Sequence, residues 1–184
     1  MRKILFAVNI TIDGYADHTA GIADDELHDF FADLLDQTDL AVLGRNTYEL
    51  MVPFWPDAVN NPNITKSELA FAVKYNAVPK IIFSKSLNKV EWNNTKLIKD
   101  DAVATLKKMK EESGDYNIFI GGLSIASSLM KENLIDEFWF LVHPVILGKG
   151  RHLFDGFLFQ KKLNLIESKT FASGVTALHY QKQN

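Results

Sequence analysis

The chain has 184 residues, a usual length for one domain with one core, and it contains no cysteine. The lack of cysteine excludes disulfides, thiolate metal sites and a cysteine nucleophile. The formal net charge is −3, with 20 Lys and Arg against 23 Asp and Glu, which argues against nucleic-acid binding because such domains are normally basic. No apolar run reaches the roughly 18 residues of a membrane helix. The apolar stretch at the N-terminus ends at Asn9 and is shorter than we expect of a signal peptide. We therefore expect a single cytoplasmic domain over residues 1–184, with no membrane or nucleic-acid partner.

Short apolar runs bounded by turn residues predict the strands of the chain. We place them at residues 4–8, 40–43, 80–83, 97–98, 117–120 and 138–147, followed by two strands on either side of a hairpin turn at Ser173-Gly174. Most of these runs lack polar alternation, which is typical of strands that are covered on both faces in a parallel sheet. The two final strands must be antiparallel because a hairpin joins them.

Segments with helical periodicity lie between the strands. We place these helices at residues 27–35, 65–75, 103–109 and 124–132. Asp24 or Asp25 is a candidate N-cap for the first helix, and Thr65 with Glu68 fits a capping box at the second. Three prolines predict a loop over residues 51–63. The pattern predicts a three-layer α/β/α domain, built on a mixed, mainly parallel sheet with a C-terminal antiparallel hairpin.

Ligands of an open α/β sheet bind beyond the carboxyl ends of its strands, so the residues that follow each strand are site candidates. These stretches are residues 9–15, 44–47, 84–86, 121–124 and 143–151. Two of them, Gly44-Arg45-Asn46-Thr47 and Gly121-Gly122-Leu123-Ser124, lead into helices whose free N–H groups suit an anion. Ser84-Lys85-Ser86 adds hydroxyls and a cation. Each stretch alone also fits an ordinary turn or cap, but their convergence on one edge predicts a ligand with several phosphates, such as a dinucleotide.

Asp13 lies at the same edge of the predicted sheet, in a turn before Gly14. Because the phosphate signals lie on other strands, we expect Asp13 to face the reacting end of a bound dinucleotide. Enclosure there would desolvate the carboxyl group and raise its pKa, which suits a group that handles a proton. An Asp before Gly is also a common turn residue. His143, which precedes Pro144, is more typical of a packed histidine than of a base.

Taken in order, these motifs resemble the dihydrofolate reductase-like superfamily. The motifs are Ile12-Asp13-Gly14-Tyr15, Leu43-Gly44-Arg45-Asn46-Thr47-Tyr48-Glu49, Phe83-Ser84-Lys85, Ile120-Gly121-Gly122 and His143-Pro144-Val145-Ile146-Leu147-Gly148-Lys149-Gly150. The chain most closely resembles stand-alone bacterial proteins similar to the C-terminal reductase domain of the bifunctional riboflavin-biosynthesis deaminase/reductase. The likeness covers essentially the whole chain, and the order of the motifs is more specific than any one of them.

The resemblance implies a sheet of about eight or nine strands and NADPH as the cofactor. The implied contacts are Arg45 and Thr47 with the cofactor phosphates, Ser84 and Lys85 with the adenosine 2′-phosphate, Gly121 and Gly122 with the pyrophosphate, Asp13 and Tyr15 with the nicotinamide and substrate, and Gly148 and Lys149 with the substrate pocket. The resemblance also implies a homodimer. The apolar run at residues 138–142 favours the same expectation, since surplus aromatic surface is commonly buried between subunits.

Two departures from the family limit the choice of substrate. Dihydrofolate reductases carry a loop with Trp and Pro ahead of an acidic residue, whereas residues 16–25 contain neither. The zinc deaminase half of the bifunctional enzyme uses a Cys-x-x-Cys pattern, and this chain has no cysteine. We expect an NADPH-dependent reductase of a small heterocyclic (pyrimidine- or pterin-like) or carbonyl substrate, similar to 5-amino-6-(5-phosphoribosylamino)uracil reductase and dihydrofolate reductase. The alternatives are a nucleotide-binding module without turnover and an interaction protein with a vestigial pocket.

Overall fold

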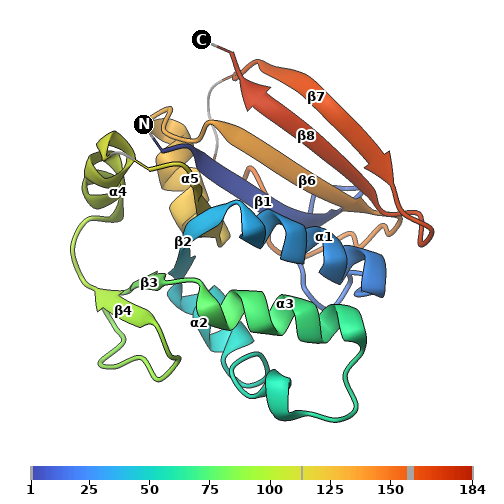
Figure 1. Cartoon of the computed structure of the whole chain (residues 1–184). Coiled ribbons are helices and arrows are strands. Elements are labelled where there is room, and N and C mark those ends of the chain that lie inside the picture. Colours follow the sequence, from blue (N-terminus) through green and yellow to red (C-terminus); the bar gives the residue numbers. More distant parts are fainter. Residues whose placement is uncertain (1, 113, 157–159, 184) are drawn as a thin grey trace.

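Eight strands form one sheet in the computed structural model, which describes residues 2–112, 114–156 and 160–183. The strands are β1 (Ile4–Thr11), β2 (Thr38–Gly44), β3 (Lys80–Phe83), β4 (Thr95–Ile98), β5 (Asn117–Gly121), β6 (Glu137–His143), β7 (Leu163–Thr170) and β8 (Thr176–Lys182). Their order is β4-β3-β2-β5-β1-β6-β8-β7. Neighbours from β4 to β6 are parallel, and β8 is antiparallel to both β6 and β7 (Figure 1). The predicted mixed sheet with a C-terminal hairpin is confirmed.

Helices cover both faces of the sheet. They are α1 (Asp25–Asp36), α2 (Arg45–Met51), α3 (Lys66–Ala77), α4 (Ala102–Glu111) and α5 (Leu123–Lys131), with one short 3-10 turn at Ala58–Asn60. Helices α1 and α3 lie on one face, and α4 and α5 lie on the other (Figure 1). The Asp24 side chain caps α1 by accepting from the Leu27 N–H, and the capping box of Thr65 and Glu68 is complete at α3. No helix among the described residues is long and apolar enough to cross a bilayer.

The two helical layers explain why the central strands are apolar throughout. In β1, Ile4 and Phe6 pack in the core beneath α4 and α5, whereas Leu5 and Ala7 pack in the core beneath α1 and α3. Both faces of the strand are therefore buried, and alternation with polar residues would place polar groups in one of the two cores. Full burial of a Leu, Ile or Phe side chain stabilises the fold by about 1.5–3 kcal/mol.

The strand predicted at residues 138–147 is too long at its C-terminal end. β6 ends at His143, because Pro144 has no N–H for a ladder and the chain turns away into a loop. Gly148 and Gly150 in that loop have φ of 73° and 125°.

The apolar side chains of β6 do not supply a surplus surface for a second subunit, since residues 138–141 are all buried within the single chain. β1 instead runs to Thr11, where its ladder with β6 reaches His143.

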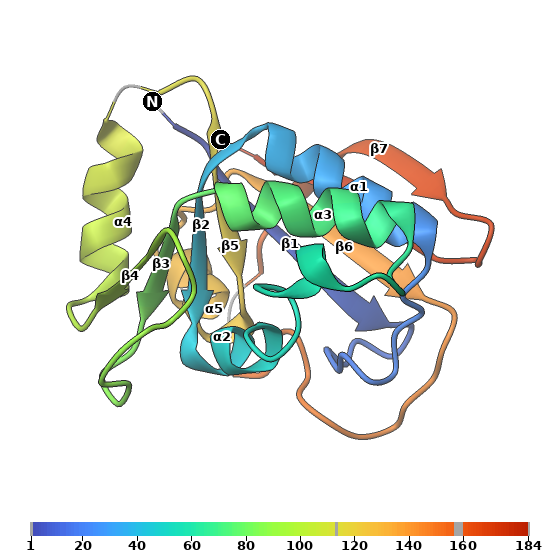
Figure 2. The same cartoon turned by 60° about the horizontal axis from the view of Figure 1, so that its bottom comes forward.

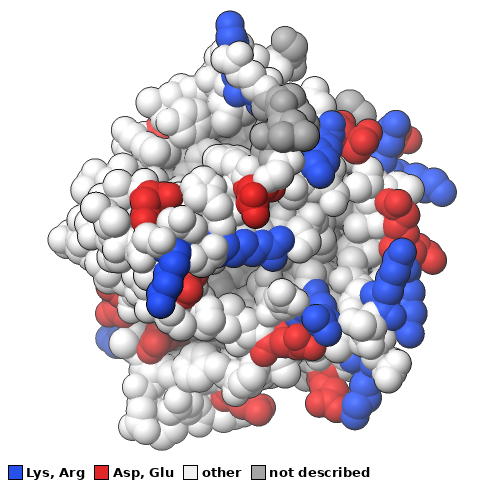
Figure 3. All heavy atoms as spheres, turned by 180° about the vertical axis from the view of Figure 1, so that it is seen from behind, with Lys and Arg blue, Asp and Glu red and all other residues white. Residues whose placement is uncertain are grey.

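Charged side chains of both signs are mixed on the surface. On the face seen from behind, the described Lys and Arg side chains stand among Asp and Glu, without one continuous basic area (Figure 3). This distribution agrees with the small net charge of −3. Any anion site on this face therefore depends on a few cations in the right place rather than on a broad positive field.

Candidate active site

Strands β2, β3 and β5 end at the same edge of the sheet (Figure 2). Residues at these ends line a cleft. Its lining residues are Gly44, Arg45, Asn46, Thr47, Phe83, Ser84, Gly122, Leu123, Ser124, Ile125 and Arg151. The volume is about 230 Å³. Whole small-molecule sites usually occupy roughly 300–1,000 Å³, so this cleft suits the phosphate part of a dinucleotide rather than all of it.

Two glycine turns form the floor of the cleft. Gly44 precedes α2 and Gly122 precedes α5, and neither helix has a side-chain cap, so the first N–H groups of α5 remain available to a ligand. Gly122 has φ of 126°, and a Cβ on it would lie 2.8 Å from Thr47 Oγ1 and 3.6 Å from the Gly44 nitrogen. The two turns therefore touch, and only glycine fits between them. Uncapped N–H groups at a helix start are a favourable place for a phosphate.

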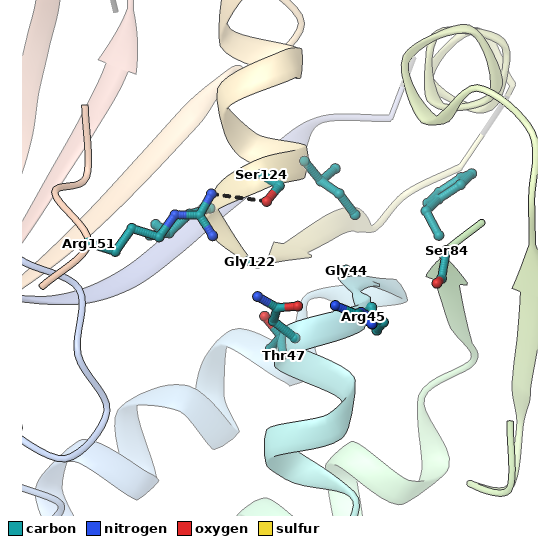
Figure 4. A pocket seen from close by; sticks show the side chains of 11 residues that line it. Gly44, Arg45, Thr47, Ser84, Gly122, Ser124 and Arg151 are labelled. Carbon is teal, nitrogen blue, oxygen red and sulfur yellow. Dashed lines mark hydrogen bonds between the residues drawn. The ribbon is translucent and has the colours of Figure 1, made fainter. Parts of the chain in front are cut away.

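Two arginines lie on different sides of this floor (Figure 4). Arg45 is on α2, and its Nε lies 3.9 Å from Glu49 Oε2 one turn along the same helix. Arg151 reaches α5 from the loop after β6, and its Nη2 donates to Ser124 Oγ at 3.0 Å (Figure 4). Within the described ranges, Arg151 has no carboxylate partner. The cleft thus combines cations, hydroxyls and free backbone N–H groups, a donor set that fits the phosphates of NADPH.

Eight of the predicted cofactor residues meet in this cleft, and two do not line it. The eight are Gly44, Arg45, Asn46, Thr47, Ser84, Gly122, Leu123 and Ser124. Lys85 follows Ser84 but is not part of the lining. Gly121 is buried at the end of β5, where a Cβ would lie 2.5 Å from Leu43 Cδ2, so a larger residue there would displace the buried Leu43 side chain. Ser84 also holds its own turn, since its Oγ accepts from the Leu87 N–H at 3.1 Å.

Asp13 lies outside the cleft and binds the loop after β6. Its carboxylate accepts from Thr11 Oγ1 at 2.6 Å, from the Gly148 N–H at 2.7 Å and from the Leu147 N–H at 3.1 Å. The bond from Thr11, with those from Gly148 and Leu147, lowers the pKa of Asp13 to about 2. The expected rise in this pKa is therefore wrong in direction, and Asp13 is ionised at neutral pH.

The other residues predicted to contact substrate lie in the same two segments as Asp13 and its hydrogen-bond partners. Tyr15 packs edge-on against His152, with 5.3 Å between ring centroids, and a Cβ on Gly150 would lie 3.7 Å from Tyr15 Cδ1. Gly148 and Lys149 belong to the same exposed loop. These residues form a second group beside the phosphate cleft, and Arg151 is the residue of this loop that enters the cleft.

Three lining residues were not singled out from the sequence, namely Phe83, Ile125 and Arg151. Phe83 and Ile125 are apolar ends of a strand and a helix, which carry no chemical signal. Arg151 does have one, because it is a cation directly after the turn Gly148-Lys149-Gly150 at the ligand-binding edge. Its importance depends on how the loop folds back, which the local sequence does not specify.

His143 is buried and packed, as its position before Pro144 suggested. Its Nδ1 accepts from the Ile22 N–H at 2.9 Å. The ring hydrogen must then be on Nε2, which lies 3.0 Å from Asn9 Oδ1. Burial lowers the pKa of His143, so the ring is neutral and serves to tie the loop after β1 to the sheet.

Comparison with known proteins shows the family of the chain. The family model described as the RibD C-terminal domain matches residues 2–177. The uncharacterized Bacillus subtilis protein YyaP is 30% identical over 182 residues, covering 97% of this chain and 94% of its own. The uncharacterized protein YwjB of the same organism is also 30% identical, over 188 residues and 97% of each chain.

Solved structures share the fold at lower identity. A putative riboflavin biosynthesis protein from Shewanella sp. PV-4 superposes with a TM-score of 0.71 at 21% identity, over the whole of both chains. Acinetobacter baumannii RibD superposes with a TM-score of 0.72 at 14% identity. The superposition covers all of this chain and 58% of the other chain. The family match over nearly the whole length and the shared fold lead to one conclusion: this chain belongs to the RibD C-terminal domain family.

Proposed function

We propose that this protein is an NADPH-dependent reductase that acts on a small heterocyclic (pyrimidine- or pterin-like) or carbonyl substrate. The observation that carries the proposal is the cleft, where segments from β2, β3, β5 and the loop after β6 bring two arginines, several hydroxyls and an uncapped helix start together. Membership of a family of reductase domains supports the reaction class.

The residues of the chain bind and orient the cofactor in this proposal. Gly122 and the start of α5 receive the pyrophosphate, Arg45 and Thr47 hold phosphate oxygens from the other side, and Ser84 with Lys85 receives the adenosine 2′-phosphate. The bound NADPH supplies the hydride, and the protein supplies position and electrostatics. Asp13, with a pKa of about 2, is already ionised, so the proposal assigns the proton to ordered water rather than to this carboxylate.

Binding and turnover measured separately test the proposed function. Fluorescence titration with NADPH and NADH measures binding, and NADPH oxidation is then followed with pterins, pyrimidines and quinones. Binding with oxidation in the presence of one substrate class supports the reductase. Binding without oxidation by any class favours a nucleotide-binding module, and no binding of either cofactor contradicts both.

Lys85→Ala should weaken NADPH binding about ten- to a hundredfold while changing NADH binding little. A hydrogen bond to a charged group contributes about 1.5–3 kcal/mol, and only NADPH carries the 2′-phosphate that Lys85 would contact. Dissociation constants for both cofactors measure the effect. An equal loss for NADPH and NADH would remove Lys85 from the 2′-phosphate site.

We also propose that two copies of the chain assemble through β7, at the edge of the sheet. Leu165 and Ile166 on this strand are 56% and 54% exposed, and an edge strand leaves one row of backbone groups unpaired. Light scattering at micromolar concentration should give about twice the chain mass of 20.8 kDa, and Ile166→Lys should return it to the mass of one chain. A mass of one chain for the unaltered protein contradicts the homodimer.

A further inference from the structure

The turn after β1 and the loop after β6 are joined along their length, although about 130 residues separate them. Backbone hydrogen bonds connect the two segments at 2.9–3.0 Å: the Ile12 N–H to the Val145 oxygen, the Ala16 N–H to the Arg151 oxygen and the Leu153 N–H to the Gly14 oxygen. Tyr15 and His152 form an antiparallel bridge between them. We call residues 11–16 and 144–153 together the clamp. Because Arg151 is part of this paired region, its backbone is fixed rather than free.

Asp13 holds the middle of the clamp, between the bond at Val145 and the pairing at residues 151–153. Its carboxylate accepts hydrogen bonds from the Leu147 and Gly148 N–H groups. These bonds direct the loop into the turn before Arg151. Hydrogen bonds to a charged group are roughly twice as strong as neutral ones. The carboxylate therefore fixes the loop at residues 147 and 148, and the bridge at His152 fixes its return to the first segment.

Arg151 leaves the clamp and reaches the start of α5. Its guanidinium donates one N–H to Ser124 Oγ, in the first turn of that helix. A guanidinium carries five N–H donors in a planar fork, so most of them remain available. Arg45, the other arginine of the cleft, already has Glu49 nearby, at 3.9 Å. Arg151 is thus the cation in the cleft whose charge no described carboxylate offsets.

We propose that Arg151 is a binding residue for the pyrophosphate of the dinucleotide, and that Asp13 is the positioning residue that holds Arg151 over the helix start. This inference rests on the proposed function and assigns the pyrophosphate a side-chain ligand in addition to the backbone of α5. It also gives Asp13 a task that an ionised carboxylate performs, namely holding the two N–H groups of the loop.

The first test asks whether binding depends on the positive charge at residue 151, on the planar shape of the guanidinium, or on any positive charge along α5. Arg151→Met should weaken NADPH and NADH binding equally, by about ten- to a hundredfold, because both cofactors carry the pyrophosphate. Arg151→Lys keeps the charge but not the fork, and should recover part of the loss. Lys131→Met removes the same charge at the far end of α5 and is the matched control, with unchanged affinity expected. Inorganic pyrophosphate, titrated by calorimetry, should bind the unaltered protein and lose binding in Arg151→Met.

A double-mutant cycle tests whether Asp13 acts through Arg151. Asp13→Asn alone should weaken NADPH binding about three- to tenfold, since the loop loses its charged acceptor. In a chain that already carries Arg151→Met, the same substitution should change the affinity little. A thermal melt checks that each variant is folded. Thr11→Val takes the place of Asp13→Asn if that variant does not fold; it removes the hydroxyl that donates to the carboxylate and that also accepts from the Tyr15 N–H at 3.0 Å.

The outcomes separate this inference from the proposed function. If NADPH binds and Arg151→Met leaves its affinity unchanged, the reductase proposal stands and Arg151 is not a pyrophosphate ligand. In a second outcome, NADPH does not bind, pyrophosphate does, and Arg151→Met abolishes pyrophosphate binding. Arg151 is then part of an anion site, but the ligand of that site is not a dinucleotide. If the effects of Asp13→Asn and Arg151→Met simply add, Asp13 does not position Arg151.

Discussion

Gly122→Val should abolish NADPH binding, with a dissociation constant at least about a hundredfold higher by fluorescence titration. Gly122 has φ of 126°. Residues other than glycine rarely adopt this backbone conformation, and β-branched residues such as valine adopt it least of all. Its Cβ would lie 2.8 Å from Thr47 Oγ1, so Thr47 must move, and the valine methyl groups would fill the approach to the start of α5. The substitution therefore blocks the phosphate site and displaces one of its hydroxyls.

The control for Gly122→Val is Gly156→Val. Gly156 also has a positive φ, 70°, but a Cβ on it meets no atom of the described residues within 4 Å. Both variants lose about 1–3 kcal/mol of stability through an unfavourable backbone conformation, but only Gly122→Val crowds the cleft. If the two variants bind NADPH equally well, Gly122 is a turn residue and the phosphates bind elsewhere.

Lys80→Met should lower the free energy of unfolding by about 2–4 kcal/mol. The Lys80 side chain is buried, and its Nζ donates to the Tyr75 oxygen at 2.6 Å and to the Val78 oxygen at 2.7 Å. The Tyr75 oxygen at the end of α3 cannot receive the usual bond from four residues on, because Pro79 has no N–H. Methionine keeps the volume but leaves these buried carbonyls without a donor, at about 1–3 kcal/mol each.

Chemical denaturation measures this loss, with Lys96→Met on the neighbouring edge strand β4 as the control. Burial lowers the pKa of Lys80 to about 8, below the unfolded value of 10.5. Between these values the unfolded chain binds a proton that the folded chain does not, so raising the pH stabilises the fold. The stability of the unaltered protein relative to Lys80→Met should therefore increase from pH 8 to pH 10.5. If the difference in the free energy of unfolding between the unaltered protein and Lys80→Met decreases over this pH range, the buried lysine stays charged.

The layers of the fold and most of the cleft follow from short stretches of sequence. Runs such as residues 81–83 and 118–120 are apolar without alternation, which is typical of a strand between two helical layers. Thr65 and Glu68 specify their helix start by local hydrogen bonds alone. The cleft was predictable because parallel strands bring the residues after them to one edge.

The parts that sequence did not predict depend on contacts between distant segments. The pKa of Asp13 is set partly by two N–H groups more than 130 residues away, whereas the sequence around Asp13 suggested only enclosure. Arg151 enters the cleft because its segment pairs with residues 14–16, and nothing near Arg151 in the sequence indicates that pairing. The end of β6 was predictable in principle, since Pro144 could not continue an interior ladder.

The position of β5 between β1 and β2 affects how the chain can fold as it is made. β1 and β2 come first along the chain but share no ladder, and each lies against β5 in the finished sheet. Until residue 121 has left the ribosome, the two earliest strands lack their common neighbour, so the early half of the chain exposes strand edges that a chaperone or another copy can occupy. The insertion of β5 joins β1 to β2, and the phosphate cleft, which also needs Gly122 and Arg151, forms only after that insertion.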